Sequence, residues 1–135
     1  MRLTQTAEYA LRALGHMATL PEGTAIRAQD LSDVTGIPIH YLSKIMRRLV
    51  EAGLLRSRKG HGGGFKFDKD LAEIRFADVL NAVDYEVEPV SCVFGWGACN
   101  NEHPCPLHPF WKSLKDEFTH WAEHYTLADV KANGE

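Results

Sequence analysis

The sequence predicts a mainly α-helical fold with one small β-hairpin and a long C-terminal helix. Several separate stretches have apolar residues at every third or fourth position, which is typical of helices that pack on a core. Between two of these stretches, a glycine-rich loop lies between short segments of strand-forming residues, which indicates a hairpin. The 135 residues are enough for one compact domain with an extension.

The N-terminal part of the chain predicts two helices. The first spans about residues 4–20, with Thr4 as its N-cap and an apolar stripe along one face. The segment Pro-Glu-Gly at 21–23 ends it. The second helix spans about residues 27–35 and is expected to bury three apolar side chains, those of Ala28, Leu31 and Val34.

A third helix is predicted after a sharp turn at Gly36 and runs from about residue 38 to 52. Pro38 fits its first position and Gly53 its end, and one face is apolar (Leu42, Ile45, Met46 and Leu49). Two helices joined by a short turn are typical of a helix-turn-helix, whose second helix enters the major groove of DNA. The candidates for DNA contact on this helix are therefore its outward residues, His40, Tyr41, Ser43, Lys44, Arg47 and Arg48.

The hairpin is predicted from strands at 54–58 and 65–68 with a turn at 59–64. Basic residues beside a glycine-rich turn suit a wing that lies along phosphates and reaches into the minor groove. The candidates on the wing are Arg56, Arg58, Lys59 and His61. The turn is not a phosphate-cofactor loop, because no Lys-Ser/Thr pair follows the glycines and no helix opens there. With a helix at 76–83, residues 1–83 are predicted to form a winged helix-turn-helix domain.

The charges are divided unequally along the chain, whose formal net charge is -3. Residues 1–75 contain 12 Lys or Arg and 8 Asp or Glu, whereas residues 76–135 contain 3 and 10. Between residues 44 and 66 there are 7 basic residues and one acidic residue. This excess of positive charge falls on the predicted third helix and wing, and it favours nucleic-acid binding there.

All three cysteines, Cys92, Cys99 and Cys105, lie in a predicted loop at 84–106 that has little helical or strand periodicity. Their odd number and tight grouping argue against a disulfide framework. Thiolates are soft ligands that suit an iron–sulfur cluster, zinc or copper(I). Zinc held by the cysteines with His103 or His108, and three buried thiols without a metal, are alternatives. A catalytic cysteine is disfavoured because no histidine with an orienting carboxylate is evident.

Residues 107–135 are predicted to form a dimerisation helix and a C-terminal tail. The helix spans about 107–124, and its apolar stripe is rich in large aromatic residues, which suggests burial against a second copy of the chain (Leu107, Phe110, Trp111, Leu114, Phe118, Trp121 and Tyr125). Thr126 is expected to cap a short turn at 127–130. No membrane-spanning run or leader pattern is found, so a cytoplasmic protein without a membrane partner is expected.

Several segments together resemble the IscR/NsrR family of iron–sulfur winged-helix transcription regulators. They are MRLTQTAEYALRAL, GIPIHYLSKIMRRLVEAGLLRS, RKGHGGGF, NAVDYEVEPVSC, CPLHPFW and YTLADV, and the resemblance covers nearly the whole chain. It implies a homodimer that crosses through the long C-terminal helix and binds a double-stranded DNA operator, most simply as a repressor and not as an enzyme.

The same resemblance implies an iron–sulfur cluster, 2Fe–2S in preference to 4Fe–4S, near the dimer interface. Its ligands would be Cys92, Cys99 and Cys105, with His108 matching the histidine of the cluster-assembly regulators. In the nitric-oxide-sensing branch the fourth ligand is an aspartate from the partner's first helix, and Glu8 stands at that position here. The signal would be iron–sulfur status, redox state or nitric oxide. A zinc-stabilised dimeric DNA-binding protein without a sensing cluster is the alternative.

Overall fold

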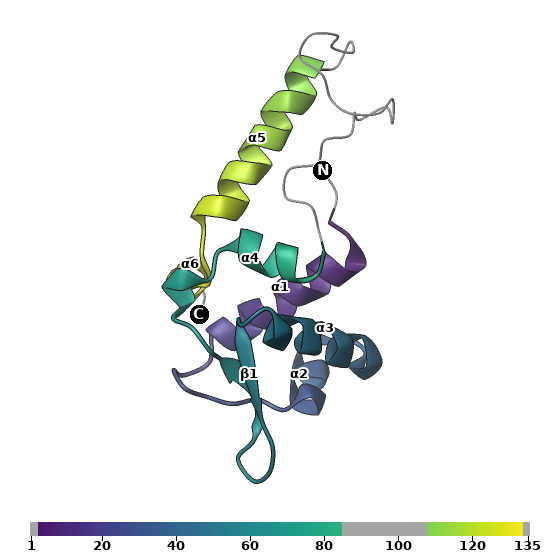
Figure 1. The fold of residues 1–135 in the computed structure, drawn as a ribbon, viewed down its shortest axis with the longest axis vertical. Helices are drawn as coiled ribbons and strands as arrows, with labels where there is room; N and C mark the ends of the chain where they lie inside the picture. Colours follow the sequence, from purple (N-terminus) through teal and green to yellow (C-terminus); the bar gives the residue numbers. More distant parts are fainter. Residues whose placement is uncertain (1–2, 85–107, 134–135) are drawn as a thin grey trace.

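The computed structural model describes residues 3–84 and 108–133, with side chains in the second range given for residues 112–131. It confirms a mainly helical fold with a two-stranded antiparallel hairpin (Figure 1). The elements in chain order are α1 (Gln5–Ala18), α2 (Ala28–Thr35), α3 (Ile39–Glu51), β1 (Leu55–Arg58), β2 (Gly64–Phe67), the short 3-10 helix η1 (Leu71–Glu73), α4 (Phe76–Ala82), α5 (His108–His124) and α6 (Leu127–Asn133).

Helix α1 lies at the centre of the core and packs against α2, α3, α4 and α6. It begins where predicted, because the Thr4 side chain accepts a hydrogen bond from the Ala7 backbone N–H at 3.1 Å. Its buried face consists largely of alanines together with Leu14 and Met17, which lets the neighbouring helices approach closely. The predicted apolar face of α3 is confirmed, since all four of its residues are buried.

The turn between α2 and α3 is made by Gly36, whose φ of 77° lies in the left-handed region that favours glycine. Pro38 precedes the first residue of α3 as its N-cap, one position earlier than predicted. The predicted burial of Val34 is wrong, because 58% of this residue is exposed, and Ala28 is only partly buried. Helix α2 packs along α3 and α1, and among its own residues only Leu31 is buried.

The hairpin pairs Leu55 with Phe67 and Arg58 with Gly64, and a third segment joins it. Ile26 forms an antiparallel bridge with Phe65, with N···O distances of 2.9 and 2.7 Å. Gly64 lies at φ 133°, and a Cβ at this position would be 2.6 Å from the Ile26 carbonyl. The wing is therefore attached through backbone atoms to the segment that leads into α2.

Two helices after the cysteine-bearing segment pack on the core formed by residues 3–84. Helix α5 packs on α4, with the Phe76 and Trp121 rings 4.8 Å apart and Ala122 fully buried. Leu127 of α6 is buried in the same core as α1, and its N–H donates to the Ile74 carbonyl. Tyr125, predicted as part of the α5 stripe, lies beyond the end of the helix and is 48% exposed.

Side-chain caps fix the starts of α4 and α6. The Asp78 carboxylate accepts from the Arg75 backbone N–H and from its guanidinium. Burial tends to raise the pKa of Asp78, but these hydrogen bonds and the charge of Arg75 hold it below its ordinary value. Thr126 precedes α6 as predicted, and its N–H donates to Asp129 at 2.8 Å. Helix α6 extends to Asn133, further than the predicted short turn at 127–130.

The arrangement in space separates two ends of the molecule. The hairpin points away from the helical core at one end, and α5 extends from the core toward the other (Figure 1). Among the described residues, no helix is long and apolar enough to span a bilayer.

Candidate nucleic-acid interface

The outward face of α3 carries every residue that was predicted on this helix to contact DNA. All six are exposed while the opposite face is buried in the core (His40, Tyr41, Ser43, Lys44, Arg47 and Arg48). Such a helix can enter a DNA groove while its buried face stays packed in the core, because only the exposed face contacts the DNA.

The four predicted wing residues are also exposed. Arg56 lies at the base of the hairpin, where its guanidinium is 3.7 Å from the Asp68 carboxylate. Arg58 ends β1, and Lys59 and His61 follow in the turn, so these three lie toward the tip. The structure therefore places positive charge at the tip, while the charge at the base is partly compensated.

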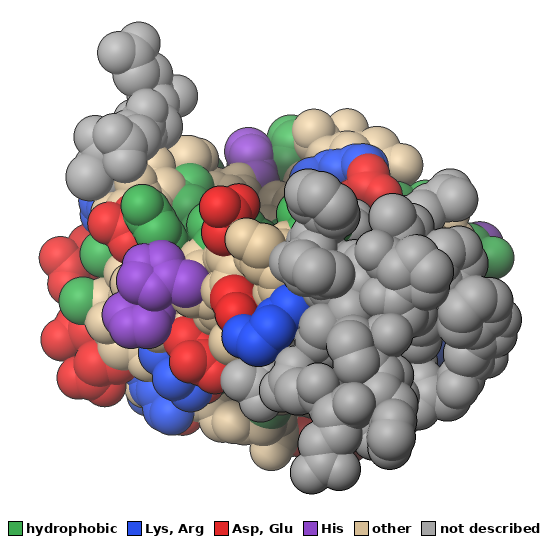
Figure 2. Space-filling view, turned by 90° about the horizontal axis from the view of Figure 1, so that it is seen from above, with side chains coloured by type: hydrophobic (Ala, Val, Ile, Leu, Met, Phe, Trp, Pro, Cys, Tyr) green, Lys and Arg blue, Asp and Glu red, His purple; other side chains and the backbone are tan. Residues whose placement is uncertain are grey.

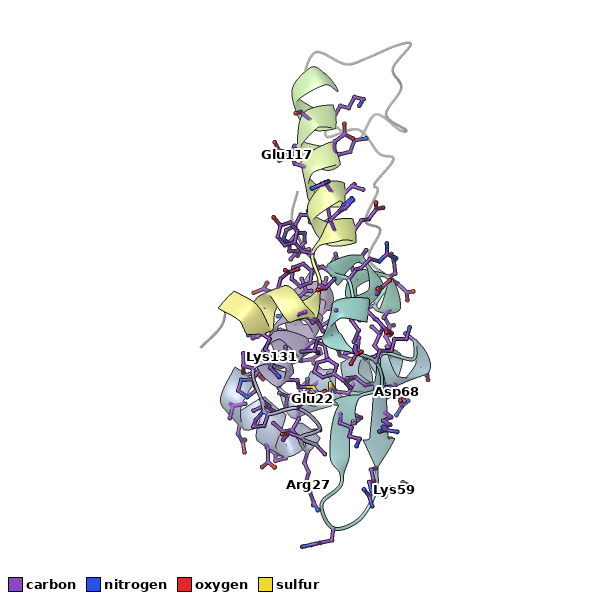
Figure 3. All side chains as sticks on the ribbon, turned by 90° about the vertical axis from the view of Figure 1, so that its left-hand side faces the viewer. Glu22, Arg27, Lys59, Asp68, Glu117 and Lys131 are labelled. Carbon is purple, nitrogen blue, oxygen red and sulfur yellow. The ribbon has the colours of Figure 1, made fainter. Side chains whose placement is uncertain are left out.

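Arg27 is a basic residue beside the wing that the sequence analysis did not select. Its guanidinium donates to the Gly60 carbonyl at 3.2 Å, and Figure 3 shows Arg27 and Lys59 near the same end of the hairpin. A shallow hollow of about 340 Å³ lies here, lined by Arg27, Ala28, Arg58, Lys59, Gly60, Gly63 and Gly64. Arg27 could have been noticed as a cation just before a helix, but its contact with the turn depends on the Ile26 bridge.

An aromatic contact links α3 to α1. The rings of His40 and Tyr41 are 4.3 Å apart, and Tyr41 lies 6.3 Å from Tyr9 of α1. The Arg12 guanidinium is 5.4 Å from the centre of the Tyr9 ring. The start of α3 is thereby held against the core helix, so part of Tyr41 serves packing even though it is 46% exposed.

Comparisons with known proteins identify the family. Residues 3–133 match the sequence model of Rrf2, described as an iron-dependent transcriptional regulator. The chain belongs to the Rrf2 family. The chain is 34% identical over 135 residues to the HTH-type transcriptional regulator IscR of Cronobacter sakazakii and to that of Escherichia coli, covering 100% of this chain and 83% of each relative.

Solved structures support the fold of this Rrf2 regulator. CymR (YrzC), the global cysteine regulator of B. subtilis, superimposes with a TM-score of 0.84 at 17% identity, covering 100% of this chain and 99% of the other. T. potens IscR has a TM-score of 0.76 at 18% identity, covering 100% and 89%. The family model and the IscR relatives at 34% identity are transcription regulators, so the chain is a regulator and not an enzyme.

Most of the predicted cluster ligands of this Rrf2 regulator lie outside the described residues. Cys92, Cys99 and Cys105, together with His103 of the zinc alternative, lie outside the described residues. His108 is the first residue of α5, and its side chain is not among those described. Within residues 3–84 and 108–133, no three His, Cys, Asp or Glu side chains are grouped to hold a metal ion.

Glu8, the other predicted ligand, is described and has a partner. Its carboxylate is 2.9 Å from the Arg12 guanidinium one turn further along α1, and both side chains are substantially exposed. Glu8 also lies in the first turn of α1, where the helix dipole favours a negative charge. Its presence at this position is thus explained within the chain itself, without a metal.

An ion pair connects α3 with the start of the cysteine-bearing segment. The Arg48 guanidinium is 3.4 Å from the carboxylate of Asp84, the last described residue before that segment. Asp84 has φ 60°, a left-handed conformation that is uncommon for residues other than glycine. A residue predicted to contact DNA therefore contacts the last described residue before the cysteine-bearing segment.

Proposed function

We propose that the chain is a homodimeric regulator, most simply a repressor, that binds a double-stranded DNA operator through α3 and the wing. The observation that carries this proposal is the exposed, basic row on α3 beside a basic wing, in a chain 34% identical to IscR. DNA binding itself follows from membership of the family. The proposed unit for it is residues 1–83, with 84–106 as the cofactor segment and 107–135 as the dimerisation part.

The residues of the proposed interface have different tasks. Ser43 and Arg47 are placed to read base edges, because a hydroxyl and a planar guanidinium can match the hydrogen-bonding groups of the major groove. Lys44, Arg58 and Lys59 are better suited to phosphates, which position the protein but carry little sequence information. Arg48 can exchange its contact with Asp84 for a phosphate.

The proposed cofactor is an iron–sulfur cluster, 2Fe–2S in preference to 4Fe–4S, held by Cys92, Cys99, Cys105 and His108. Three thiolates and one imidazole are a donor set that fits such a cluster. When bound, the cluster supplies a centre that responds to oxidation, iron supply or nitric oxide. The chain's part is to hold it and to transmit its state, and the Arg48–Asp84 pair offers a route from the cysteine-bearing segment to α3.

The fourth ligand is tested by anaerobic reconstitution of His108→Ala and Glu8→Ala beside Cys99→Ala. We expect Cys99→Ala to lose the cluster and His108→Ala to hold it at least about 10-fold less stably, while Glu8→Ala resembles the wild type. Glu8 is expected to be dispensable because Arg12 already binds its carboxylate. Absorption spectra and the iron and sulfide contents of each chain give the measurement.

The opposite pattern would contradict this assignment. If Glu8→Ala loses the wild-type spectrum and His108→Ala keeps it, the ligand set resembles that of the nitric-oxide-sensing branch. A colourless wild-type protein that contains zinc at the cysteines after anaerobic purification would instead favour the zinc-stabilised alternative.

The homodimer is proposed to form through α5. Leu114 is 47% exposed on this helix, although Leu is a residue that a monomeric core would bury. Phe118 and Trp121 follow at helical spacing and are only partly buried. An apolar row of this length on a helix that extends away from the core suits contact with the same helix of a second copy (Figure 1).

Leu114→Asp should convert the dimer to a monomer that remains folded. Because Leu114 is outside the core cluster, the charge should disrupt the contact between copies and not the packing of the chain. Trp121→Asp is a less selective test, since Trp121 also packs on Phe76. Sedimentation at micromolar concentration measures the mass, and circular dichroism verifies the helices. An unchanged dimer for Leu114→Asp would place the interface elsewhere.

A further inference from the structure

We propose that His120 and His124 form a binding site for a divalent cation of the zinc class on the exposed surface of α5. The two residues lie one helical turn apart, so their side chains share a face. Their rings are stacked, with centroids 4.1 Å apart and planes inclined by 21°, and both residues are exposed. Two histidines four residues apart on a helix are spaced to hold one metal ion.

A hydrogen bond orients His124 as a ligand. Its Nδ1 is 2.9 Å from the backbone carbonyl oxygen of His120. A carbonyl can only accept, so Nδ1 carries the proton and the lone pair of the neutral ring lies on Nε2. Histidines that bind metals commonly donate their second ring N–H to a carbonyl or carboxylate, which fixes both the tautomer and the orientation of the ring.

The surroundings of the pair favour a cation. Glu117 and Glu123 each lie three residues from His120, and none of the residues one turn away from either histidine is Lys or Arg. Figure 2 shows a patch of histidine side chains with acidic and basic side chains beside it, and Figure 3 shows Glu117 on the side of α5. Glu117 and Glu123 therefore add negative charge near the pair, although Arg75 lies close enough to Glu123 to offset part of it.

The donors define the class of metal. Imidazole nitrogen suits Zn²⁺, Cu²⁺ and Ni²⁺, whereas Mg²⁺ and Ca²⁺ prefer oxygen ligands. No third ligand is grouped with the pair among the described residues, so water completes the coordination. The two histidines are not among the proposed cluster ligands, and they lie on the opposite side of α5 from Ala122, which packs on α4.

The test is a zinc titration of the full-length reduced chain against a chromophoric chelator. The wild type is expected to bind one more equivalent of Zn²⁺ than the double variant His120→Ala/His124→Ala. Any zinc bound at the cysteines is the same in both proteins, so it does not affect this difference. His16→Ala, which removes an imidazole from α1, is the matched control and should bind as the wild type does. Circular dichroism verifies that all three proteins have the same helical content.

A second measurement locates the ion directly. In NMR spectra, the ring signals of His120 and His124 should shift on addition of Zn²⁺ while those of His16 stay in place. The proposal is wrong if the double variant binds the same number of equivalents with the same affinity as the wild type, or if the His16→Ala control loses the same equivalent.

Discussion

Arg47→Ala is expected to weaken binding to the specific operator by about 10- to 100-fold, the loss typical of a guanidinium that reads a base. Arg47 is exposed at the centre of the outward face of α3, and no ion pair with another described side chain holds it in the free protein. Its guanidinium can therefore enter the groove without first breaking a contact. An operator selected from random duplexes with the wild-type protein gives the probe.

The control for Arg47→Ala removes the same charge from a distant element. Lys131 lies on α6, which packs on α1 and η1 and is on the opposite side of the molecule from α3 (Figure 1). Lys131→Ala should leave the affinity within about twofold of wild type, because a single distant charge is largely screened in salt. Equal losses for Arg47→Ala and Lys131→Ala, or no loss for either, would remove α3 from the interface.

Gly64→Ala should destabilise the fold by about 3 kcal/mol and weaken DNA binding together with it. The new methyl group would lie 2.6 Å from the carbonyl carbon and oxygen of Ile26, and these backbone atoms cannot move without breaking the bridge to Phe65. Residue 64 must also adopt a φ of 133°, a conformation that residues other than glycine rarely adopt. Urea unfolding gives the change in the free energy of unfolding.

Gly62→Ala is the control in the same turn, without the close contact and with a less restricted backbone conformation. Gly62 is in the same turn, also has a positive φ (73°), and has no neighbouring atom within 4 Å of the position of a Cβ. It should therefore lose only about 1 kcal/mol, the cost of the left-handed conformation. If both variants lose the same amount, the close approach of residue 64 to Ile26 adds no measurable cost and the prediction is wrong.

Structural features that depend on a pattern of several neighbouring residues were predicted correctly from the sequence. The apolar face of α3, the turn at Gly36 and the cap at Thr4 each depend on local periodicity or local hydrogen bonding, which neighbouring residues determine. The error at Val34 has the opposite origin. Whether a valine near the end of a short helix is buried depends on what packs beside it, and the sequence of the helix does not contain that information.

The candidate site was predicted less completely, because some of its contacts join distant segments. The Ile26–Phe65 bridge is a single residue pair and has no strand periodicity, so neither the attachment of the wing nor the position of Arg27 could be expected. The Arg48–Asp84 pair likewise joins distant residues, whereas the Glu8–Arg12 pair lies one turn apart on α1 and follows from the helical spacing alone. Residue types on α3 and the wing were sufficient to select the basic face, but not to show how α1 and α2 support it.

The contacts on either side of residues 84–124 have a consequence for how the protein folds. Phe76 donates its N–H to the Tyr125 carbonyl, and Leu127 donates to that of Ile74, so the segment starts and ends at the same small helix, α4. Backbone hydrogen bonds therefore hold the two ends of this segment close together. Because the entropy of closing a loop grows only with the logarithm of its length, joining these two contacts through a long intervening segment costs little more than joining them through a short one. Helix α5 also contributes the fully buried Ala122 to this core, so α1, α4, α5 and α6 are expected to unfold together.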